Sequence, residues 1–319
     1  MMCKGISVVV PCLNESEGIL LFCKEMERYA AGVGFLIELV FVDDGSSDNT
    51  AELIGQFSFQ NIASAKIIRL SKNFGSHAAI RAGLQYAGYG ICTWMGSDLQ
   101  EPVEFLEASM EKIGLGYDAV YIEKESIDIS ICSRIFSKMY SLLVRKYAVK
   151  NYGTGGISNI VFNRKVKHMV NENIESNSAI HLQIMDAGFR GITIPMRCSA
   201  RAVGSSKWTL AKKIKLFIDS FVSFSYTPLR LVSIVGIGMF FMGMIIGFQT
   251  FVNKIINPVV PTGYSTIMCI LALGFGITNI ALGIIAEYLW RTYDAARKRP
   301  VFIVSEIKEI KHMESEYKL

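Results

Sequence analysis

Four clusters of polar residues carry the side chains that could do chemistry. They lie at residues 11–15, 43–48, 71–75 and 96–101, and each directly follows a short apolar run. Carboxylates gathered in one place repel one another unless a cation or hydrogen-bond donors offset their charge. Any one cluster could be an ordinary turn. If the four meet, they predict a site for a metal ion together with a base or a sugar.

The apolar runs before these clusters are predicted to be the strands that position them. Strands are expected at residues 6–10, 36–42, 66–70, 91–95 and 119–122, and helices at 17–31, 50–57, 77–87 and 103–113. Alternation of this kind predicts an α/β fold with a mostly parallel sheet and helices on both faces. Ligands of such sheets bind at the carboxyl ends of the strands, which is where the clusters fall.

The second half of the chain contains two long runs without a charged residue, at 231–252 and 266–286. Each would form a helix about 30 Å long, which matches the hydrocarbon core of a bilayer. We therefore predict two transmembrane helices; two buried core helices are the alternative. Amphipathic helices are predicted at 133–147 and 208–224. The second is expected to lie in the membrane interface, with a plain surface helix as the alternative.

The charge pattern predicts an orientation in the membrane. The net charge is +5, and basic residues flank both apolar runs, whereas the loop between the runs carries only Lys254. The positive-inside rule then places both chain ends in the cytoplasm. No export signal is recognised, and seven scattered cysteines suit reduced thiols. The basic patch borders the predicted spans, so we expect contact with membrane lipid and no nucleic-acid binding. A Gly243-x-x-x-Gly247 pattern could support a homo-oligomer through these helices.

Several sequence segments carry a family resemblance. They are VPCLNE, VDDGSSDNT, LSKNFGSHAAIRAGLQYA and DLQEP, which begin at residues 10, 42, 70 and 98. Together they resemble family 2 glycosyltransferases, and more narrowly the polyprenyl-phosphate type, such as dolichol-phosphate mannose synthase and bacterial undecaprenyl-phosphate glucosyltransferases. The resemblance implies a GT-A-like (Rossmann-like) fold. It divides the chain into a cytoplasmic catalytic domain (1–207), a juxtamembrane helix (208–228), two transmembrane helices (229–290) and a charged cytoplasmic tail (291–319).

The resemblance also implies roles for individual residues. Asp98 and Gln100 would hold Mg²⁺ or Mn²⁺ beside the donor diphosphate, and Asp98 would be catalytic together with Arg201 and Lys207, which lie on a flexible loop with Ser206. Arg134 and Lys138 would bind the phosphate of the lipid acceptor. Asp44 would accept a hydrogen bond from the nucleobase. The other residues implied for the donor nucleotide are Pro11, Leu13, Glu15, Asp43, Asn73 and Arg81.

The sequence departs from the family at the metal site, where Gly96 replaces the first aspartate of the usual Asp-x-Asp pair. We interpret the chain as an inverting transferase that moves a hexose from a UDP- or GDP-sugar to undecaprenyl phosphate at the inner membrane. One alternative is transfer to a sugar hydroxyl of a lipid-linked oligosaccharide. Another is a non-catalytic membrane scaffold with a degraded metal site. His77 and His181 are interpreted as structural.

Overall fold

The structure is a computed structural model that describes residues 5–125, 157–174, 179–197, 227–256 and 263–310. It divides into two compact units. The first unit consists of Met1–Ser220 together with Pro300–Leu319, and the second of Phe221–Arg299.

The first unit is built on an eight-stranded sheet with the strand order β7-β5-β6-β4-β1-β2-β3-β8. Four neighbouring strands, β4, β1, β2 and β3, run parallel to one another. Three pairings are antiparallel, namely β4 with β6, β5 with β6, and β3 with β8. The strands are β1 (Gly5–Cys12), β2 (Leu36–Asp43), β3 (Ser64–Leu70), β4 (Ile91–Trp94), β5 (Ala119–Glu125), β6 (Ile157–Phe162), β7 (Gly191–Arg197) and β8 (Val304–Ile310).

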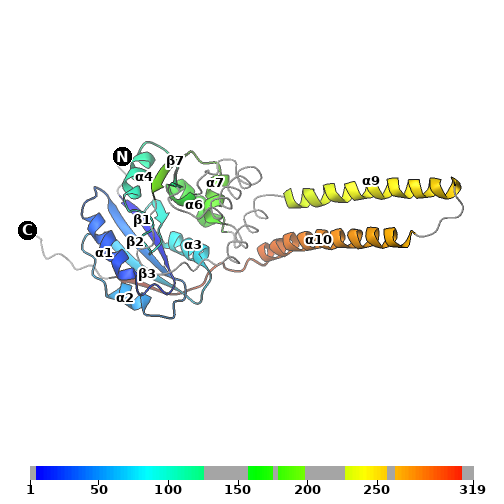
Figure 1. The fold of residues 1–319 in the computed structure, drawn as a ribbon. Coiled ribbons are helices and arrows are strands. Elements are labelled where there is room, and N and C mark those ends of the chain that lie inside the picture. The colour runs from blue at the N-terminus through cyan, green and yellow to red at the C-terminus, as the bar shows by residue number, and fades with distance from the viewer. Residues whose placement is uncertain (1–4, 126–156, 175–178, 198–226, 257–262, 311–319) are drawn as a thin grey trace, which may run out of the picture. The chain divides into compact units, whose positions relative to one another are not determined.

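Helices cover both faces of this sheet (Figure 1). On one face, apolar side chains of α1, α2 and α4 join alternate residues of the central strands, such as Val8, Val10 and Phe41, in one buried core. Helix α3 packs on β1 and β2 from the other face and contacts α6, which in turn contacts α7. These helices are α1 (Ile19–Ala30), α2 (Thr50–Gln56), α3 (Ser76–Tyr86), α4 (Phe105–Gly114), α6 (Arg164–Glu172) and α7 (Ile180–Asp186).

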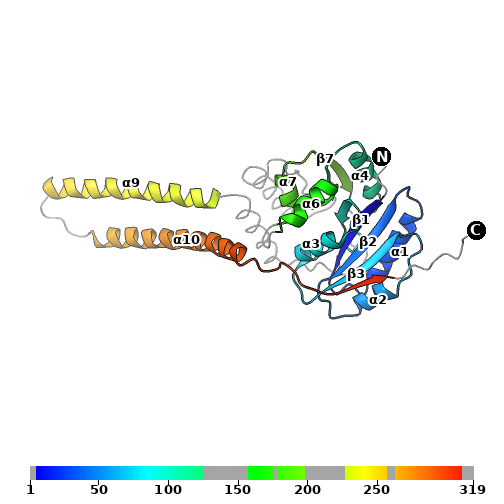
Figure 2. The same cartoon turned by 180° about the vertical axis from the view of Figure 1, so that it is seen from behind.

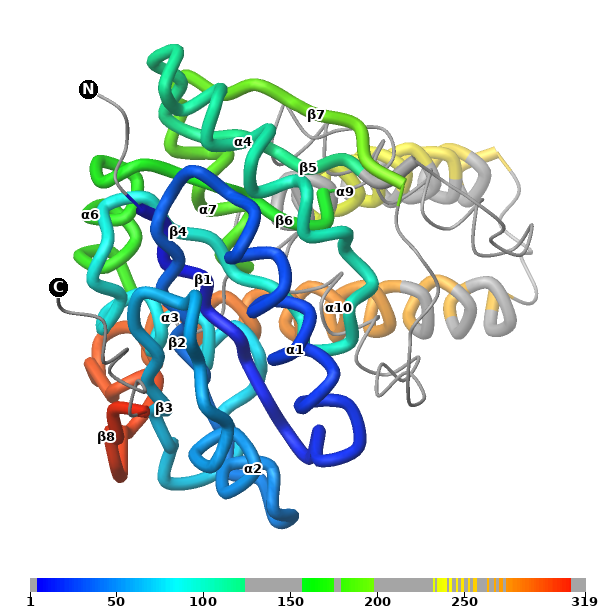
Figure 3. Tube along the Cα trace, turned by 90° about the vertical axis from the view of Figure 1, so that its left-hand side faces the viewer, coloured from blue at the N-terminus to red at the C-terminus, as the bar shows by residue number. Residues whose placement is uncertain are grey.

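The structure confirms the predicted α/β class, with all five predicted strands and all four predicted helices of the first 122 residues. The strands β6, β7 and β8 and the helices α6 and α7 were not predicted. Strand β8 is the most unexpected of these, because it comes from the segment interpreted as a tail and extends the sheet next to β3 (Figure 3). The predicted helices at 133–147 and 208–224 lie outside the described residues.

The second unit contains two long helices, α9 (Thr227–Ile256) and α10 (Tyr264–Arg297). They include both charge-free runs, so the helical part of that prediction is confirmed. In the part of the chain that the structure describes, no helix has the combined length and hydropathy needed to cross a bilayer. Membrane spanning by α9 and α10 therefore stays a prediction.

Candidate functional site

The carboxyl ends of four parallel strands bring the polar clusters to one edge of the sheet. Cys12 at the end of β1 pairs with Asp43 at the end of β2, and Asp43 pairs with Arg69 near the end of β3. Strand β4 lies on the other side of β1, where Val9 pairs with Trp94. All four clusters therefore begin along the same edge, as the strand pattern predicted.

The first two loops are joined by side-chain to backbone hydrogen bonds. The Asn14 carboxamide oxygen accepts from the amide of Ser47 at 2.8 Å, and the amide of Asn14 donates to Ser46 Oγ at 2.9 Å. The amide of Ser16 donates to Asp48 Oδ2 at 3.2 Å. Burial alone would raise the pKa of Asp48, but hydrogen bonds from Thr50 and Ser16 outweigh that effect and lower it. The two loops thus form one connected surface.

Asp44 connects the second loop to the third. Its Oδ1 accepts from the amide of Phe74 at 2.7 Å, and its Oδ2 accepts from the amide of Gly75 at 2.8 Å. The loops touch closely at Gly45, which has a positive φ of 75° and where a Cβ would lie 2.8 Å from the amide nitrogen of Asn73. Only glycine fits this approach without strain.

The surroundings of Asp44 disfavour the ionised form of its carboxyl group. Its side chain is buried. Burial raises its pKa, the amides of Phe74 and Gly75 partly offset that effect, and neighbouring Asp43 raises it further. A carboxylate with a raised pKa at a strand edge is a candidate for binding a ligand that donates hydrogen bonds.

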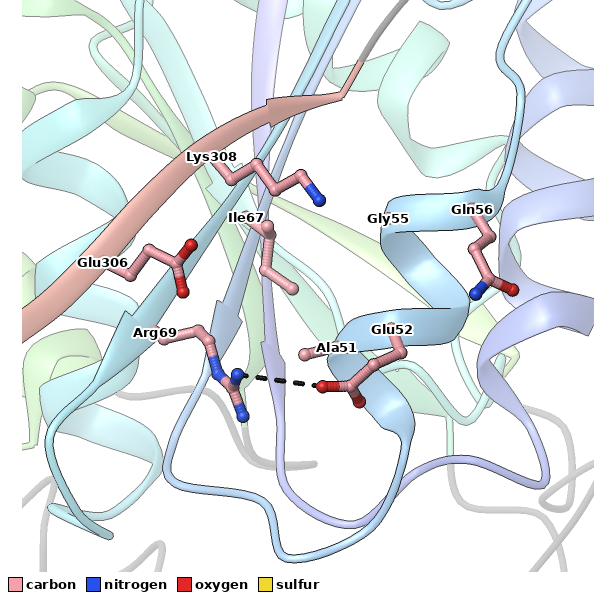
Figure 4. Close-up of a pocket in the computed structure, with 8 residues that line it drawn as sticks. All are labelled: Ala51, Glu52, Gly55, Gln56, Ile67, Arg69, Glu306 and Lys308. Atoms are coloured by element: carbon pink, nitrogen blue, oxygen red, sulfur yellow. Dashed lines mark ion pairs between the residues drawn. The ribbon is translucent and has the colours of Figure 1, made fainter.

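Asp43 is used differently, because its carboxylate is satisfied within the protein. It accepts from the amide of Ser46 at 2.8 Å and from Arg69 Nε at 3.1 Å. Arg69 also lies 3.7 Å from Glu52 of α2 (Figure 4). These bonds fix the loop that carries Asp44. Contact of Asp43 with the donor nucleotide, which the family resemblance implies, stays a prediction.

The fourth loop carries the residues predicted to hold a metal ion. Asp98 and Gln100 are both partly buried, and the Gln100 amide donates to Asp98 Oδ1 at 3.4 Å. A Cβ on Gly96 would lie 2.9 Å from that same oxygen, so the Asp98 carboxylate occupies space that a larger residue 96 would need. Gly96 is thus suited to this placement of Asp98.

The donor set of this loop suits a hard divalent cation, because a carboxylate and a carboxamide both offer oxygen ligands. Among the described residues, no group of three or more His, Cys, Asp or Glu side chains could hold a metal ion. Mg²⁺ is commonly bound by one or two carboxylates, with substrate phosphates and water completing the shell. The residues present therefore fit an ion that binds together with a diphosphate.

Asn159 of β6 supports the fourth loop and was missed by the sequence analysis. Its side chain is fully buried, and its Nδ2 donates to the Trp94 carbonyl and, at 3.0 Å, to Glu101 Oε2. Its Oδ1 accepts from Thr93 Oγ1 at 3.0 Å. One carboxamide thereby ties β6 to both ends of the loop that carries Asp98. The signal that could have found it is an asparagine within a strand-like apolar run.

The remaining predicted site residues are placed as follows. Pro11 is partly buried within β1, Leu13 and Glu15 are partly buried in the loop after it, and Asn73 is exposed in the third loop. Arg81 is 2% exposed, and its Nη2 donates to Gln183 of α7 at 2.8 Å. It therefore joins α3 to α7, and nucleotide contact by Arg81 stays a prediction. The predicted residues Arg134, Lys138, Arg201, Ser206 and Lys207 lie outside the described residues.

The rings of the two histidines that the sequence interpretation made structural lie next to each other. The centroids of His77 and His181 are 6.0 Å apart. Burial lowers the pKa of His181 to about 3, and the proximity of His77 adds to the effect. His181 is thus neutral in the folded protein at physiological pH.

This pKa predicts an acid-sensitive stability. Because the unfolded chain takes up a proton on His181 near its ordinary pKa and the folded protein does not, stability is full above about pH 6.5 and is lost as the pH falls toward 3. Between pH 7 and pH 5 we expect a loss of about 2 kcal/mol in the free energy of unfolding. Denaturant titration of His181→Phe should show a smaller loss than the parent chain. The exposed His168 is the control, since His168→Gln should keep the full loss; equal curves for the parent and His181→Phe would contradict the assignment.

The family model described as "Glycosyl transferase family 2" matches residues 7–175. The uncharacterized glycosyltransferase YkcC of Bacillus subtilis is 31% identical over 303 residues, which cover 94% of this chain and 93% of that protein. The undecaprenyl-phosphate 4-deoxy-4-formamido-L-arabinose transferase of Klebsiella pneumoniae (strain 342) is 27% identical over 306 residues, covering 95% and 94%.

Among solved structures, one similar chain is the mannosyltransferase PcManGT from Pyrobaculum calidifontis in complex with GDP-Man and Mn²⁺. It is 18% identical in sequence, with a TM-score of 0.45, and the match covers 92% of this chain and 75% of that one.

Proposed function

Since the chain belongs to glycosyl transferase family 2 and is a glycosyltransferase, we propose that it moves a hexose or a related sugar from a UDP- or GDP-sugar to undecaprenyl or another polyprenyl phosphate. The observation that carries this proposal is that the Asp44 loop and the Asp98 loop begin along the same edge of the sheet, on either side of β1. The name of the Klebsiella relative, an undecaprenyl-phosphate transferase, supports the choice of acceptor.

In this proposal the nucleotide lies along the carboxyl ends of β1 and β2. Asp44 accepts a hydrogen bond from the base, and Asp43 keeps the Asp44 loop in place through Ser46 and Arg69. Asp98 and Gln100 would lie at the diphosphate and would hold Mg²⁺ or Mn²⁺. When bound, the ion stabilises the negative charge on the departing diphosphate.

The transfer reaction forms one bond and breaks one. An oxygen of the lipid phosphate attacks the anomeric carbon of the sugar, while the bond from that carbon to the nucleoside diphosphate breaks and its electron pair leaves with the diphosphate. The configuration at that carbon is inverted. A phosphate monoester is largely ionised at neutral pH, so it needs little help from a general base. Arg134 and Lys138 are proposed to bind this phosphate, and Arg201 and Lys207 the donor diphosphate.

We further propose that α9 and α10 anchor the enzyme in the plasma membrane, with the catalytic unit and both chain ends in the cytoplasm. The charge-free runs within both helices support this. Large apolar side chains are also exposed along them, including Phe248 at 70%, Phe275 at 68% and Ile245 at 66%. Exposed apolar surface of this extent is typical of contact with lipid or with other protein. Anchoring would keep the enzyme beside its acceptor and so reduce the entropic cost of their encounter.

The proposal is tested by a screen of radiolabelled UDP- and GDP-sugars with membranes that contain the full chain. Each reaction is run with undecaprenyl phosphate and, separately, with a lipid-linked oligosaccharide. We expect label to enter undecaprenyl phosphate with one donor and only with Mg²⁺ or Mn²⁺ present. Label in the oligosaccharide alone would favour transfer to a sugar hydroxyl. Failure to bind any nucleotide by calorimetry would favour the non-catalytic scaffold.

A further inference from the structure

We propose that strand β8, together with Ile303 before it, positions the third loop (residues 71–75) for binding the donor nucleotide. The inference rests on the proposed function, and it assigns a positioning role to a segment that was interpreted from the sequence as a charged tail. Figure 2 shows β8 along the edge of the sheet, next to β3.

The pairing of β8 with β3 continues as far as the beginning of this loop. The antiparallel register runs from Ala65 opposite Ile310 to Leu70 opposite Val304. Beyond it, the amide of Ser71 donates to the carbonyl of Ile303 at 2.9 Å. The C-terminal segment therefore holds the first residue of the third loop directly.

A side chain of β8 reinforces the same point. Ser305 Oγ donates to the carbonyl of Arg69 at 3.0 Å. Arg69 is the residue whose Nε donates to Asp43, the carboxylate that fixes the Asp44 loop. The C-terminal segment thus contacts the backbone of Arg69, which supports Asp43, through Ser305 of β8, and the backbone of Ser71, which begins the third loop, through Ile303.

The far end of the loop is held by the candidate nucleotide-binding residue itself, because Asp44 accepts the amides of Phe74 and Gly75. A five-residue loop is therefore held at its start by Ile303 and at its end by Asp44. Between these points Lys72 and Asn73 are exposed. Without Ile303, the amide of Ser71 would lose its partner and the start of the loop would be held less firmly. We expect the amides of Phe74 and Gly75, the partners of Asp44, to be less ordered as a result.

Strand β8 adds little to the hydrophobic core. Ile310 is 5% exposed, but five of the seven residues are exposed, including Ile307 at 45%. Glu306 and Lys308 point from β8 toward α2, where they line a cavity of about 230 Å³ with Arg69 and Glu52 (Figure 4). Since the buried area is small, we expect the fold to survive the loss of β8, which makes a positioning role separable from a structural one.

The experiment compares two shortened chains in membranes, one ending at Ile310 and one ending at Arg299. The first keeps every described contact of β8 and is the matched control. The second loses the two hydrogen bonds that reach the loop region, from Ser71 to Ile303 and from Ser305 to Arg69. We therefore expect its donor KM to rise about tenfold, whereas its acceptor KM should stay within about twofold of the control. Hydrogen exchange at the amides of Phe74 and Gly75 should quicken about tenfold, while exchange in β1 stays unchanged.

Two further measurements keep the test decisive if the shorter chain is unstable. A peptide of residues 300–312 added to it should restore the donor KM by pairing with the free edge of β3. In the full chain, Ser305→Ala should raise the donor KM about threefold, and Ser305→Thr, which keeps a hydroxyl, should restore it.

Unchanged donor KM and unchanged exchange at Phe74 and Gly75 in the chain ending at Arg299 would overturn the inference. So would a global loss of protection that the peptide does not reverse, combined with a Ser305→Ala variant that behaves as the parent. Failure of the full chain to bind UDP or GDP would instead sink the proposed function, because the exchange measurement needs no nucleotide and reports on the loop by itself.

Discussion

Replacing Asp98 with asparagine is expected to abolish sugar transfer while the protein still folds and still enters the membrane. Asparagine keeps the size of the side chain but removes the charge that a divalent ion needs. Gly96 stands at the first position of the usual Asp-x-Asp pair, so Asp98 is the aspartate of the pair that remains. Loss of a group that stabilises leaving-group charge typically costs about 100- to 1,000-fold in kcat. We expect at least this loss, measured with a saturating donor in isolated membranes.

The control is Glu104→Gln, which removes a carboxylate from an exposed position a few residues further along. Its activity should match the parent chain. Gly96→Ala tests the position of the Asp98 carboxylate without removing its charge. The added Cβ would lie 2.9 Å from Asp98 Oδ1 and would push the carboxylate aside. That change should lower activity in the parent chain. Full activity of Asp98→Asn would show that the metal assignment is wrong.

The core of the fold could be predicted because its strands are continuous apolar runs. Val8, Val9 and Val10 sit in β1, which is covered by helices on both faces, so the run needs no alternation. Strand β8 lacked this signal. Its apolar residues Val304, Ile307 and Ile310 recur every third position, which does not match the two-residue period of a strand. Its charged side chains suit an exposed edge strand.

The sequence predicted which loops lie at the site but not the contacts that their side chains make. That the clusters share an edge follows from parallel strands, and the structure confirms it. The partners of Asp44 are backbone amides of Phe74 and Gly75, and a backbone donor leaves no mark in the sequence. The Arg69 bond to Asp43 depends on the register between β2 and β3, which the hydrophobic pattern does not set.

Asp44→Asn is expected to lower donor affinity about 10- to 100-fold with little change in stability. A hydrogen bond to a charged group contributes about 1.5–3 kcal/mol, and the uncharged carboxamide loses most of that contribution. Asparagine also loses one of the two acceptors for the amides of Phe74 and Gly75, which is destabilising. It removes, however, a buried charge that repels Asp43, and burial and this repulsion together raise the pKa of Asp44. The two stability effects oppose each other, whereas the effect on binding does not.

The pH dependence separates these effects. Because the pKa of Asp44 is higher in the folded protein than in the unfolded chain, its contribution to stability is present at low pH and is lost as the pH rises through the folded pKa. Asp44→Asn should remove this loss. Asp48 has a lowered pKa, so Asp48→Asn should instead remove stability that is present above the ordinary pKa. Calorimetry with UDP and GDP measures the affinity for the nucleotide, and unfolding at pH 4 and pH 7 measures the stability.

A carboxylate that is buried and ionised at a cost to folding is expected where binding requires the charge. If Asp44→Asn lost stability at neutral pH in proportion to its loss of donor affinity, Asp44 would be a structural residue that only holds the third loop. If the affinity falls while stability at pH 7 holds, the carboxylate acts on the nucleotide, and the loop amides at Phe74 and Gly75 serve to orient it.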